Sequence, residues 1–498
     1  MEVKFTKLER ALKADTLVLP FIEGEKEIET DEKLKRVIKP ALALKEKKKK
    51  KGEVSLFYPD REDVPKRIFL VGLGKKEELN TEPIRQAYAA VAKKLAAMKI
   101  DTAAIVVPEI ACDEFSRGER LRPVEIAGAV AEGVSLADYA FDKYMTPEKE
   151  EDKYQPLKSI TFVGNLSKGV KETVREKLVI ADAVKYARDL QNDTADLVCP
   201  EYLARQAKTI AKEHGLKCTV FDKKKIEKLG MGLLLAVNRG SNLEPRFIVL
   251  EYKGDPKSKD KTAILGKGLT FDSGGYNLKP TKFIETMRED MSGAAVTLGI
   301  IKGAARLKLK KNLVGVIPAT ENMIGSRAYK PGDIYPSMSG KTVEIGSTDA
   351  EGRLILADAL TYIVQKIKPA RIIDFATLTG AILITFGDVV IGAMTNDDKI
   401  YETIYKAGEA TYERVWRLPI YDEYRELLKS DIADIKNLGG RPAGSITAAA
   451  FLEKFVEGTP WLHLDIAGVS WLEKERHYIP KNGTGTGVRL MIEFLKKM

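Results

Sequence analysis

Short apolar runs alternate with helical periodicities along most of the chain. In the first third the runs are brief, rich in Val, Ile and Leu, and bounded by turn-forming residues, which predicts buried strands at residues 16–20, 67–74 and 103–107. Apolar positions three and four residues apart predict amphipathic helices at residues 83–98 and 124–139. The pattern therefore predicts an N-terminal α/β domain over residues 1–165.

A change of pattern separates this region from the rest of the chain. Residues 142–156 are charged and contain prolines, residues 159–164 again have the pattern of a strand, and residues 168–190 carry one long helical period. With 498 residues the chain is too long for one simple core, so two domains are expected. We expect a connector helix over residues 166–194 between them.

From residue 195 onward the alternation returns. β-rich runs occur at residues 246–252, 262–266, 313–318, 371–376 and 462–467. Helical patterns lie between several of these runs, at residues 293–307, 354–367 and 445–455. Strands that alternate with helices predict a mostly parallel sheet with helices on both faces. The expected fold class is therefore α/β with two domains, the second an α/β/α layer domain over residues 195–498.

Composition excludes several classes of protein. The hydrophobic share of 44% and charged share of 31% are typical of a soluble globular protein, and the chain has no run of 18 apolar residues that would predict a membrane span. The N-terminus lacks the pattern of a signal peptide, and three cysteines are too few for a disulfide framework. We therefore expect a cytoplasmic protein. Only three histidines occur, so any metal must be held mainly by carboxylates.

Part of the net charge of +10 comes from a local run of lysines at residues 45–51. A solvated loop or hairpin tip is one interpretation of such a run, and contact with nucleic acid is the other. The run contains no interleaved aromatic residues, which argues against a surface for stacking single-stranded bases.

The strongest chemical signal is a pair of carboxylates, Asp349 and Glu351, followed by Arg353. Residues two apart in an extended segment point to the same side, so both carboxylates can converge on one point. Carboxylates held that close repel each other unless a proton or a cation lies between them. The motif therefore predicts a cation site.

A second polar cluster lies upstream and contains Lys267, Asp272, Lys279 and Asp290. Taken singly, these residues have ordinary interpretations: Asp290 precedes a helical pattern and is placed to be its N-cap. The glycines around Asp272 permit a phosphate-binding loop, although their spacing fits neither a Walker A motif nor a dinucleotide fingerprint. Taken together with Asp349 and Glu351, the acidic residues are numerous enough to hold two metal ions ~3.5–4 Å apart.

Several segments resemble the leucyl (cytosol) aminopeptidase family, and the resemblance covers most of residues 180–498. The segments that carry it are residues 266–280, 322–334, 337–344, 348–354, 376–381 and 463–468. The spacing of the seven polar residues from Lys267 to Arg353 also matches the family. The N-terminal region matches only in position and general pattern.

The resemblance implies a two-metal aminopeptidase, with manganese or zinc as the metal. By position, the implied metal ligands are Lys267, Asp272, Asp290, Asp349 and Glu351, with Asp272 and Glu351 bridging both ions. The implied catalytic residues are Lys279, which would polarise the scissile carbonyl, and Arg353, which would hold a bicarbonate ion acting as general base.

The resemblance also implies the substrate and the assembly. The pocket for the first side chain aligns with Met287, Thr377, Gly380 and Ala467, and substrates would be peptides with a free N-terminus and leucine-like first residues. The family forms homohexamers, and the N-terminal domain would shape access and assembly. A two-metal phosphoesterase remains an alternative, as does an additional nucleic-acid-binding role of the basic N-terminal half.

Two positions depart from the family pattern. Ser347 stands where the family usually has asparagine, and residues 191–196 replace a turn that usually contains more proline. Neither position supplies an expected ligand, and Ser347 is expected to shape the loop before Asp349. His463 lies in an apolar strand pattern, where a hydrogen-bonded structural role is favoured over a catalytic one, and Asp465 is similar.

Overall fold

The computed structural model describes residues 1–498 except 26–27, 29, 44–49, 111–120 and 150–151. Most of the lysine run at residues 45–51 lies outside the described residues. The chain divides into two compact units, which are described separately. The first contains Met1–Asp182 and Lys474–Pro480, and the second contains Ala183–Glu473 and Lys481–Met498. Helix α5 (Lys168–Asn192) therefore contributes residues to both units.

The first unit is built on a six-stranded sheet in the order β1-β6-β5-β2-β4-β3, parallel except for the β3–β4 pair. Its strands are β1 (Glu2–Thr6), β2 (Thr16–Glu23), β3 (Val54–Phe57), β4 (Arg67–Lys75), β5 (Thr102–Val106) and β6 (Ser159–Val163). Its helices are α1 (Leu8–Ala11), α2 (Glu32–Ala43), α3 (Thr81–Ala97) and α4 (Pro123–Ala137).

Two apolar layers hold this sheet. Residues of α3, α4 and α5 pack with one set of strand side chains, and residues of α1 and α2 pack with the other. Strand side chains alternate between faces, so β2, β4, β5 and β6 each supply residues to both layers. The fold of this region confirms the predicted α/β layer arrangement.

The second unit contains a nine-stranded sheet whose main path is β16-β15-β18-β14-β9-β11-β8-β7, with β10 paired to β11. Its strands are β7 (Lys217–Phe221), β8 (Arg246–Lys253), β9 (Lys261–Gly266), β10 (Gly268–Asp272), β11 (Asn312–Asn322), β14 (Arg371–Ala376), β15 (Ile391–Thr395), β16 (Val415–Arg417) and β18 (Trp461–Asp465). The central neighbours β18, β14, β9 and β11 are parallel. A mostly parallel sheet, as predicted, is therefore present.

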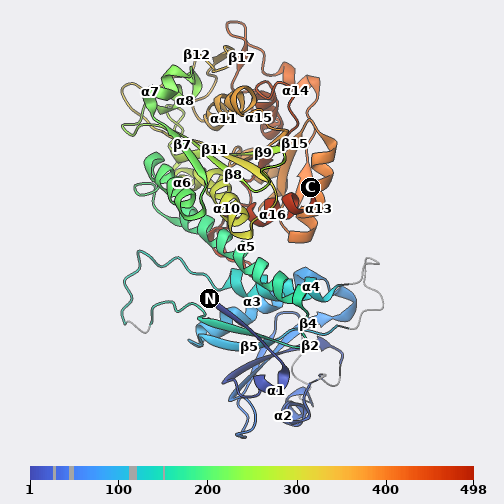
Figure 1. The fold of residues 1–498 in the computed structure, drawn as a ribbon. Helices are drawn as coiled ribbons and strands as arrows, with labels where there is room; N and C mark the ends of the chain where they lie inside the picture. Colours follow the sequence, from blue (N-terminus) through green and yellow to red (C-terminus); the bar gives the residue numbers. More distant parts are fainter. Residues whose placement is uncertain (26–27, 29, 44–49, 111–120, 150–151) are drawn as a thin grey trace. The chain divides into compact units, whose positions relative to one another are not determined.

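Helices cover both faces of this sheet (Figure 1). On one side lie α6 (Pro200–His214), α10 (Ser292–Leu307) and α16 (Val488–Lys497); on the other lie α8 (Gly232–Asn238), α11 (Gly352–Tyr362) and α15 (Gly444–Glu453). The shorter helices are α7 (Lys223–Lys228), α9 (Thr281–Ile284), α12 (Gly380–Phe386) and α14 (Asp422–Glu426). The longer helix α13 (Asp398–Thr411) packs against α16. Among the described residues, no helix combines the length and the apolar character that a membrane span requires.

The strand pattern at residues 342–346 predicts that Asp349 follows a strand of the main sheet, and this expectation is wrong. The run before Asp349 forms β13 (Thr342–Glu344), which pairs with β12 (Ile334–Pro336) and β17 (Ile435–Lys436) in a separate three-stranded sheet. A small β19–β20 hairpin, Trp471–Leu472 with Asn482–Gly483, is also separate. Asp349 therefore does not follow a strand of the main sheet, and its loop is carried by the small sheet instead.

Candidate metal centre and active site

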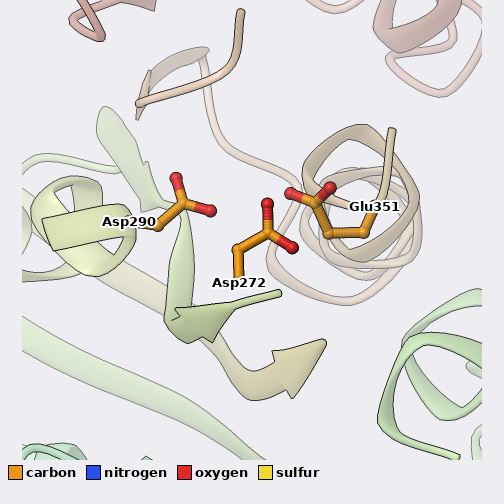
Figure 2. Close-up of side chains that lie close together, drawn as sticks. All are labelled: Asp272, Asp290 and Glu351. Carbon is orange, nitrogen blue, oxygen red and sulfur yellow. The ribbon is translucent and has the colours of Figure 1, made fainter. Parts of the chain in front are cut away.

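Three buried carboxylates converge from three separate segments, as Figure 2 shows. Asp272 is the last residue of β10, Asp290 lies in the 3-10 turn Met287–Met291, and Glu351 directly precedes α11. One carboxylate oxygen from each lies within 4.8 Å of the others. A parallel sheet gathers loops at the carboxyl ends of its strands, which explains why residues distant in sequence meet here.

Two lysines lie between the carboxylates. Lys267, which follows β9, places Nζ 2.7 Å from Asp290 Oδ1 and 3.0 Å from Glu351 Oε1. Lys279 places Nζ 2.8 Å from Asp272 Oδ2 and 2.6 Å from Asp349 Oδ1. We call these six residues the site cluster. It brings together all five predicted metal ligands and the predicted catalytic lysine.

The site cluster has more negative than positive groups, because four carboxylates face two lysines. Burial and the neighbouring Glu351 charge raise the pKa of Asp290 to about 7 and that of Asp349 to about 6, although Lys267 and Lys279 oppose the shifts. Burial opposes the charge on Lys267, but the surrounding carboxylates outweigh it and raise its pKa. Without a metal, the lysine ammonium groups are the partners that hold these acids together.

Glycines make the close approach of these loops feasible. Gly274 has φ +85°, and a Cβ there would lie 2.4 Å from the Asn277 carbonyl oxygen and 2.9 Å from Asp349 Oδ1. Its N–H donates to Asp272 Oδ1 at 2.8 Å. A Cβ at Gly352 would lie 2.8 Å from Lys267 Nζ. Both positions require glycine because a larger residue would push the charged side chains apart.

Two asparagines that were not predicted as site residues hold the segments of the site cluster together by hydrogen bonds. Asn322, at the end of β11, donates through Nδ2 to Asp272 Oδ1 at 2.8 Å and to the Thr348 carbonyl at 2.9 Å. Asn437 accepts from the Gly346 N–H at 2.7 Å and donates to the Ser347 carbonyl at 2.7 Å. Asn322 lies in a segment that carried the family resemblance. Asn437 had no local signal, because its role arises only when β17 pairs with β13.

Arg353 is buried on the first turn of α11. Its Nη1 donates to the Asn437 carbonyl at 2.8 Å, whereas its Nε is buried and has no hydrogen-bond partner in the described part of the chain. Burial lowers the Arg353 pKa to about 10. A buried guanidinium N–H without an acceptor fits an anion such as bicarbonate. Nearby, Ser347 Oγ accepts from the Asp349 N–H at 3.1 Å, which agrees with the expected loop-shaping role.

The four predicted pocket residues lie at the same edge of the sheet or in turns beside it. Thr377 follows β14 and donates through Oγ1 to Asp290 Oδ1 at 2.6 Å, while its carbonyl accepts from Lys267 Nζ at 2.8 Å. Gly380 begins α12, and a Cβ there would meet nothing within 4 Å. Ala467 follows β18, and Met287 begins the 3-10 turn that carries Asp290.

Two sequence interpretations of single residues are resolved. Asp290 is not the N-cap of α10, because Met291 occupies that position and no side chain caps the helix. Asp290 instead faces Lys267 and Thr377. His463 is fully buried, with Nδ1 2.5 Å from Asp374 Oδ1, and Trp461 Nε1 donates to the other oxygen of Asp374 at 2.6 Å. His463 is therefore hydrogen-bonded within the sheet, as expected of a structural histidine.

The donor set fits divalent metal ions. Asp290 Oδ2 is buried and has no hydrogen-bond partner among the described residues, so this carboxylate has an oxygen available for a cation. Asp272, Asp349 and Glu351 supply further hard oxygen donors, and Lys267 could add a nitrogen after losing its proton. The arrangement can therefore neutralise its excess charge by binding metal.

Comparisons with known proteins agree with this chemistry. Residues 18–148 match the N-terminal domain of the cytosol aminopeptidase family, and residues 185–492 match its catalytic domain. A probable cytosol aminopeptidase of Protochlamydia amoebophila is 46% identical, covering 99% of this chain and 97% of that protein. One from Geotalea uraniireducens is 47% identical, with coverages of 86% and 85%.

A solved structure has the same fold. The bottromycin maturation enzyme BotP superposes with a TM-score of 0.84 at 31% identity, covering 97% of this chain and 99% of BotP. The same enzyme in complex with Mn gives a TM-score of 0.83. With the whole-length relatives and both domain matches, these similarities lead to one conclusion. The chain belongs to the cytosol aminopeptidase family of metal-dependent aminopeptidases.

Proposed function

We propose that the chain removes N-terminal amino acids, preferentially leucine-like ones, from peptides by using two divalent metal ions. The observation that carries the proposal is the convergence of Asp272, Asp290 and Glu351, whose ligand oxygens lie within 4.8 Å of one another. Two lysines interleave with them, and four carboxylates exceed what two lysines neutralise. Manganese or zinc suits this donor set, with Asp349 and Lys267 as the remaining ligands.

The metal ions, when bound, would polarise a carbonyl and lower the pKa of water toward neutrality. The protein's own residues prepare the site for this. Lys267 must release its Nζ proton to become a ligand, so metal binding is expected to release protons and to weaken at low pH. Asn322 and Asn437 hold the loops that carry Asp272 and Asp349, so the ligands need little rearrangement.

Lys279 is the proposed electrostatic catalyst. Its Nζ is bound by Asp272 and Asp349, and the surrounding carboxylates raise its pKa even though burial opposes its charge. It therefore keeps its proton at neutral pH and can stabilise negative charge that develops on the scissile carbonyl oxygen. Arg353, with its unpartnered Nε, is suited to hold bicarbonate as the proton acceptor.

The first side chain of the peptide would lie against Thr377, Gly380, Ala467 and Met287. The open space at Gly380 supports this assignment, because a small residue there leaves room for a substrate side chain. An apolar pocket discriminates by only ~1–3 kcal/mol per methylene, so we expect broad specificity with a preference for leucine.

The test compares leucine p-nitroanilide with its N-acetylated form, each with Mn²⁺, Zn²⁺ or a chelator. We expect cleavage of the free amine only, and loss of cleavage with chelator. Equal rates on both forms, or indifference to chelator, would contradict the proposal. Hydrolysis of p-nitrophenyl phosphate at a comparable rate would favour the phosphoesterase alternative instead.

Three broader features of the resemblance are carried forward as proposals. They are a homohexamer, a cytoplasmic location, and a role of the N-terminal domain, residues 1–165, in access and assembly. Light scattering of the purified chain tests the first, because a hexamer has six times the mass of the 55.2 kDa chain. Salt-dependent DNA binding that survives Glu351→Ala would support a separate nucleic-acid role.

A further inference from the structure

A buried carboxylate outside the site cluster joins the two turns that carry most of the proposed pocket. Asp465 is the last residue of β18 and is 1% exposed. Its Oδ1 accepts from the Leu378 N–H at 3.1 Å and from the Ala467 N–H at 3.2 Å. Its Oδ2 accepts from the Thr379 hydroxyl at 2.7 Å. One side chain therefore fixes the turn after β14 relative to the turn after β18.

The direction of these hydrogen bonds extends the link to two helices. Thr379 has a single hydroxyl proton, and with Asp465 ionised this proton is donated to Asp465 Oδ2, because an ionised carboxylate only accepts. Ser445 Oγ, 2.6 Å away, must therefore donate to Thr379 Oγ1. The Ile382 N–H also donates to Thr379 Oγ1 at 3.3 Å, which caps α12. The start of α12 and the start of α15 are thus held by the same carboxylate.

The residues that Asp465 anchors are neighbours of the proposed pocket residues or belong to the pocket themselves. Leu378 and Thr379 lie between Thr377 and Gly380, and Ala467 is itself a pocket residue. The turn after β18 also meets the other end of α12, because a Cβ at Gly468 would lie 2.3 Å from the Gly387 carbonyl oxygen. Asp465 therefore holds the first turn of α12, through Thr379, next to the turn after β18.

We propose that Asp465 is a positioning residue that sets the width of the pocket for the first side chain and so determines selectivity among N-terminal residues. The inference rests on the proposed aminopeptidase function. Among the described residues, Asp465 accepts hydrogen bonds from the pocket turns and from none of the six residues of the site cluster. Its loss should therefore change selectivity more than metal binding.

The variants separate geometry from charge. Asp465→Ala removes both acceptor oxygens and their three hydrogen bonds, whereas Asp465→Asn keeps Oδ1 for the two N–H groups and can donate to Thr379 Oγ1. Thr379→Val is a milder change that removes only the hydroxyl link. Asp358→Ala is the matched control, because Asp358 is also fully buried and also accepts three hydrogen bonds. Its donors are the N–H groups of Leu233, Leu234 and Met338, none of which is a proposed pocket residue.

The first readout is the ratio of kcat/KM for leucine and alanine p-nitroanilides in the full-length, metal-loaded protein, with bound metal measured beside it. We expect Asp465→Ala to lower the leucine preference about tenfold, within the about 10–200-fold range that apolar pockets achieve. Thr379→Val should lower it about threefold. Asp465→Asn and Asp358→Ala should keep the ratio within twofold, and metal content should stay unchanged in all four.

The second readout does not depend on activity. Hydrogen–deuterium exchange of the full chain should be faster over residues 376–382 and 464–470 in Asp465→Ala, while Asp465→Asn stays close to the wild type. Unchanged exchange there, an unchanged leucine-to-alanine ratio in an active Asp465→Ala protein, or an equal ratio change in Asp358→Ala would overturn the inference. A wild-type protein that cleaves neither anilide would instead reject the proposed function, leaving the exchange result to decide whether Asp465 holds these turns.

Discussion

Each unit of the chain contains a buried cluster of charged side chains, and the two clusters are balanced differently. In the first unit, Arg85 Nε donates to Glu132 Oε2 at 2.9 Å and its Nη1 contacts Glu82, while Lys177 lies 3.2 Å from Glu132 Oε1. Tyr478 donates to the Glu82 carboxylate at 3.2 Å. In these contacts of the described residues two carboxylates meet two cations, and we call Glu82, Arg85, Glu132, Lys177 and Tyr478 the N-terminal charge cluster.

The site cluster of the second unit has twice as many carboxylates for the same number of cations. Asp290 Oδ2 has no hydrogen-bond partner within the described residues, and Asp290 and Asp349 both have raised pKa values. A balanced buried cluster is complete by itself, whereas an acidic excess requires protons or added cations. The comparison shows that buried charge alone does not distinguish the candidate active site. What distinguishes it is the excess of carboxylates over cations.

The largest expected effect is on catalytic activity, which should depend on the site cluster and not on the N-terminal charge cluster. Glu351→Gln removes a proposed bridging ligand and should lower kcat/KM for leucine p-nitroanilide about ten-thousandfold, equivalent to about 5 kcal/mol in the barrier. Glu132→Gln, the matched change in the N-terminal charge cluster, should leave the activity per folded molecule within about threefold. Similar losses in both variants would remove the distinction.

The next prediction concerns the sign of the stability change in metal-free protein. Arg85→Met leaves Glu82 and Glu132 buried without their shared guanidinium and should lower the free energy of unfolding by about 3–4 kcal/mol. Asp290→Asn should leave it unchanged or raise it at pH 8, because it relieves repulsion within the site cluster. Urea unfolding with chelator measures both. If Asp290→Asn lost as much stability as Arg85→Met, the site cluster would not carry the excess negative charge that we infer.

The imbalance also predicts a pH dependence. The folded protein raises the pKa of Asp290 to about 7, above its ordinary value of 3.8, so the folded state binds this proton more tightly than the unfolded chain. The free energy of unfolding should therefore fall as pH rises from about 4 to 7. Between pH 5 and pH 8 the loss due to Asp290 should be about 2–3 kcal/mol.

Asp358 has a pKa raised to about 7 by burial and contributes with the same sign, so the test is the difference between wild type and Asp290→Asn. Without metal, the wild type should lose more stability between pH 5 and pH 8 than the variant does. Saturating Mn²⁺ should restore wild-type stability at pH 8 and should stabilise Asp290→Asn less, because one of the five proposed ligands is missing. Parallel pH profiles of the two proteins would exclude Asp290 as the source.

The smallest expected effect tests how the N-terminal charge cluster is completed. Tyr478 belongs to the segment Lys474–Pro480, which joins the first unit although it comes late in the sequence. Tyr478→Phe removes a donor to a buried carboxylate and should cost about 1–2 kcal/mol of unfolding free energy. Thermal unfolding measures it, with Tyr58→Phe on the exposed surface as the control. Equal melting temperatures for the two variants would show that the hydroxyl contributes nothing to stability.

The sequence predicted much of the fold because the relevant signals are local. The strands at residues 67–74 and 371–376 and the helix at 168–190 agree with β4, β14 and α5 to within two residues. Their apolar periodicity follows directly from burial on one or two faces. The strand at 313–318 was too short, since β11 continues to Asn322, where polar residues pair within the sheet and give no apolar signal.

The sequence predicted which residues form the site better than it predicted how they are held in place. Asp349 and Glu351 were expected to converge because they are two apart, and all six members of the site cluster are brought together. The supporting residues Asn322 and Asn437 had no assigned role beforehand, and Asp465 was expected only to be structural. Their hydrogen bonds join segments that are from about 25 to 90 residues apart, and no local pattern encodes such partners.

By itself, the sequence determined the α/β class, the two-part organisation and the acidic residues that require a cation, because periodicity and charge are properties of short segments. Only the tertiary structure decided that Asp349 is carried by a separate small sheet and that Asp290 faces Lys267 instead of capping α10. It also decided that one buried cluster is balanced and the other is not. The physical reason is that charge balance depends on which side chains share a low-dielectric space, and strand pairing between distant segments sets that neighbourhood.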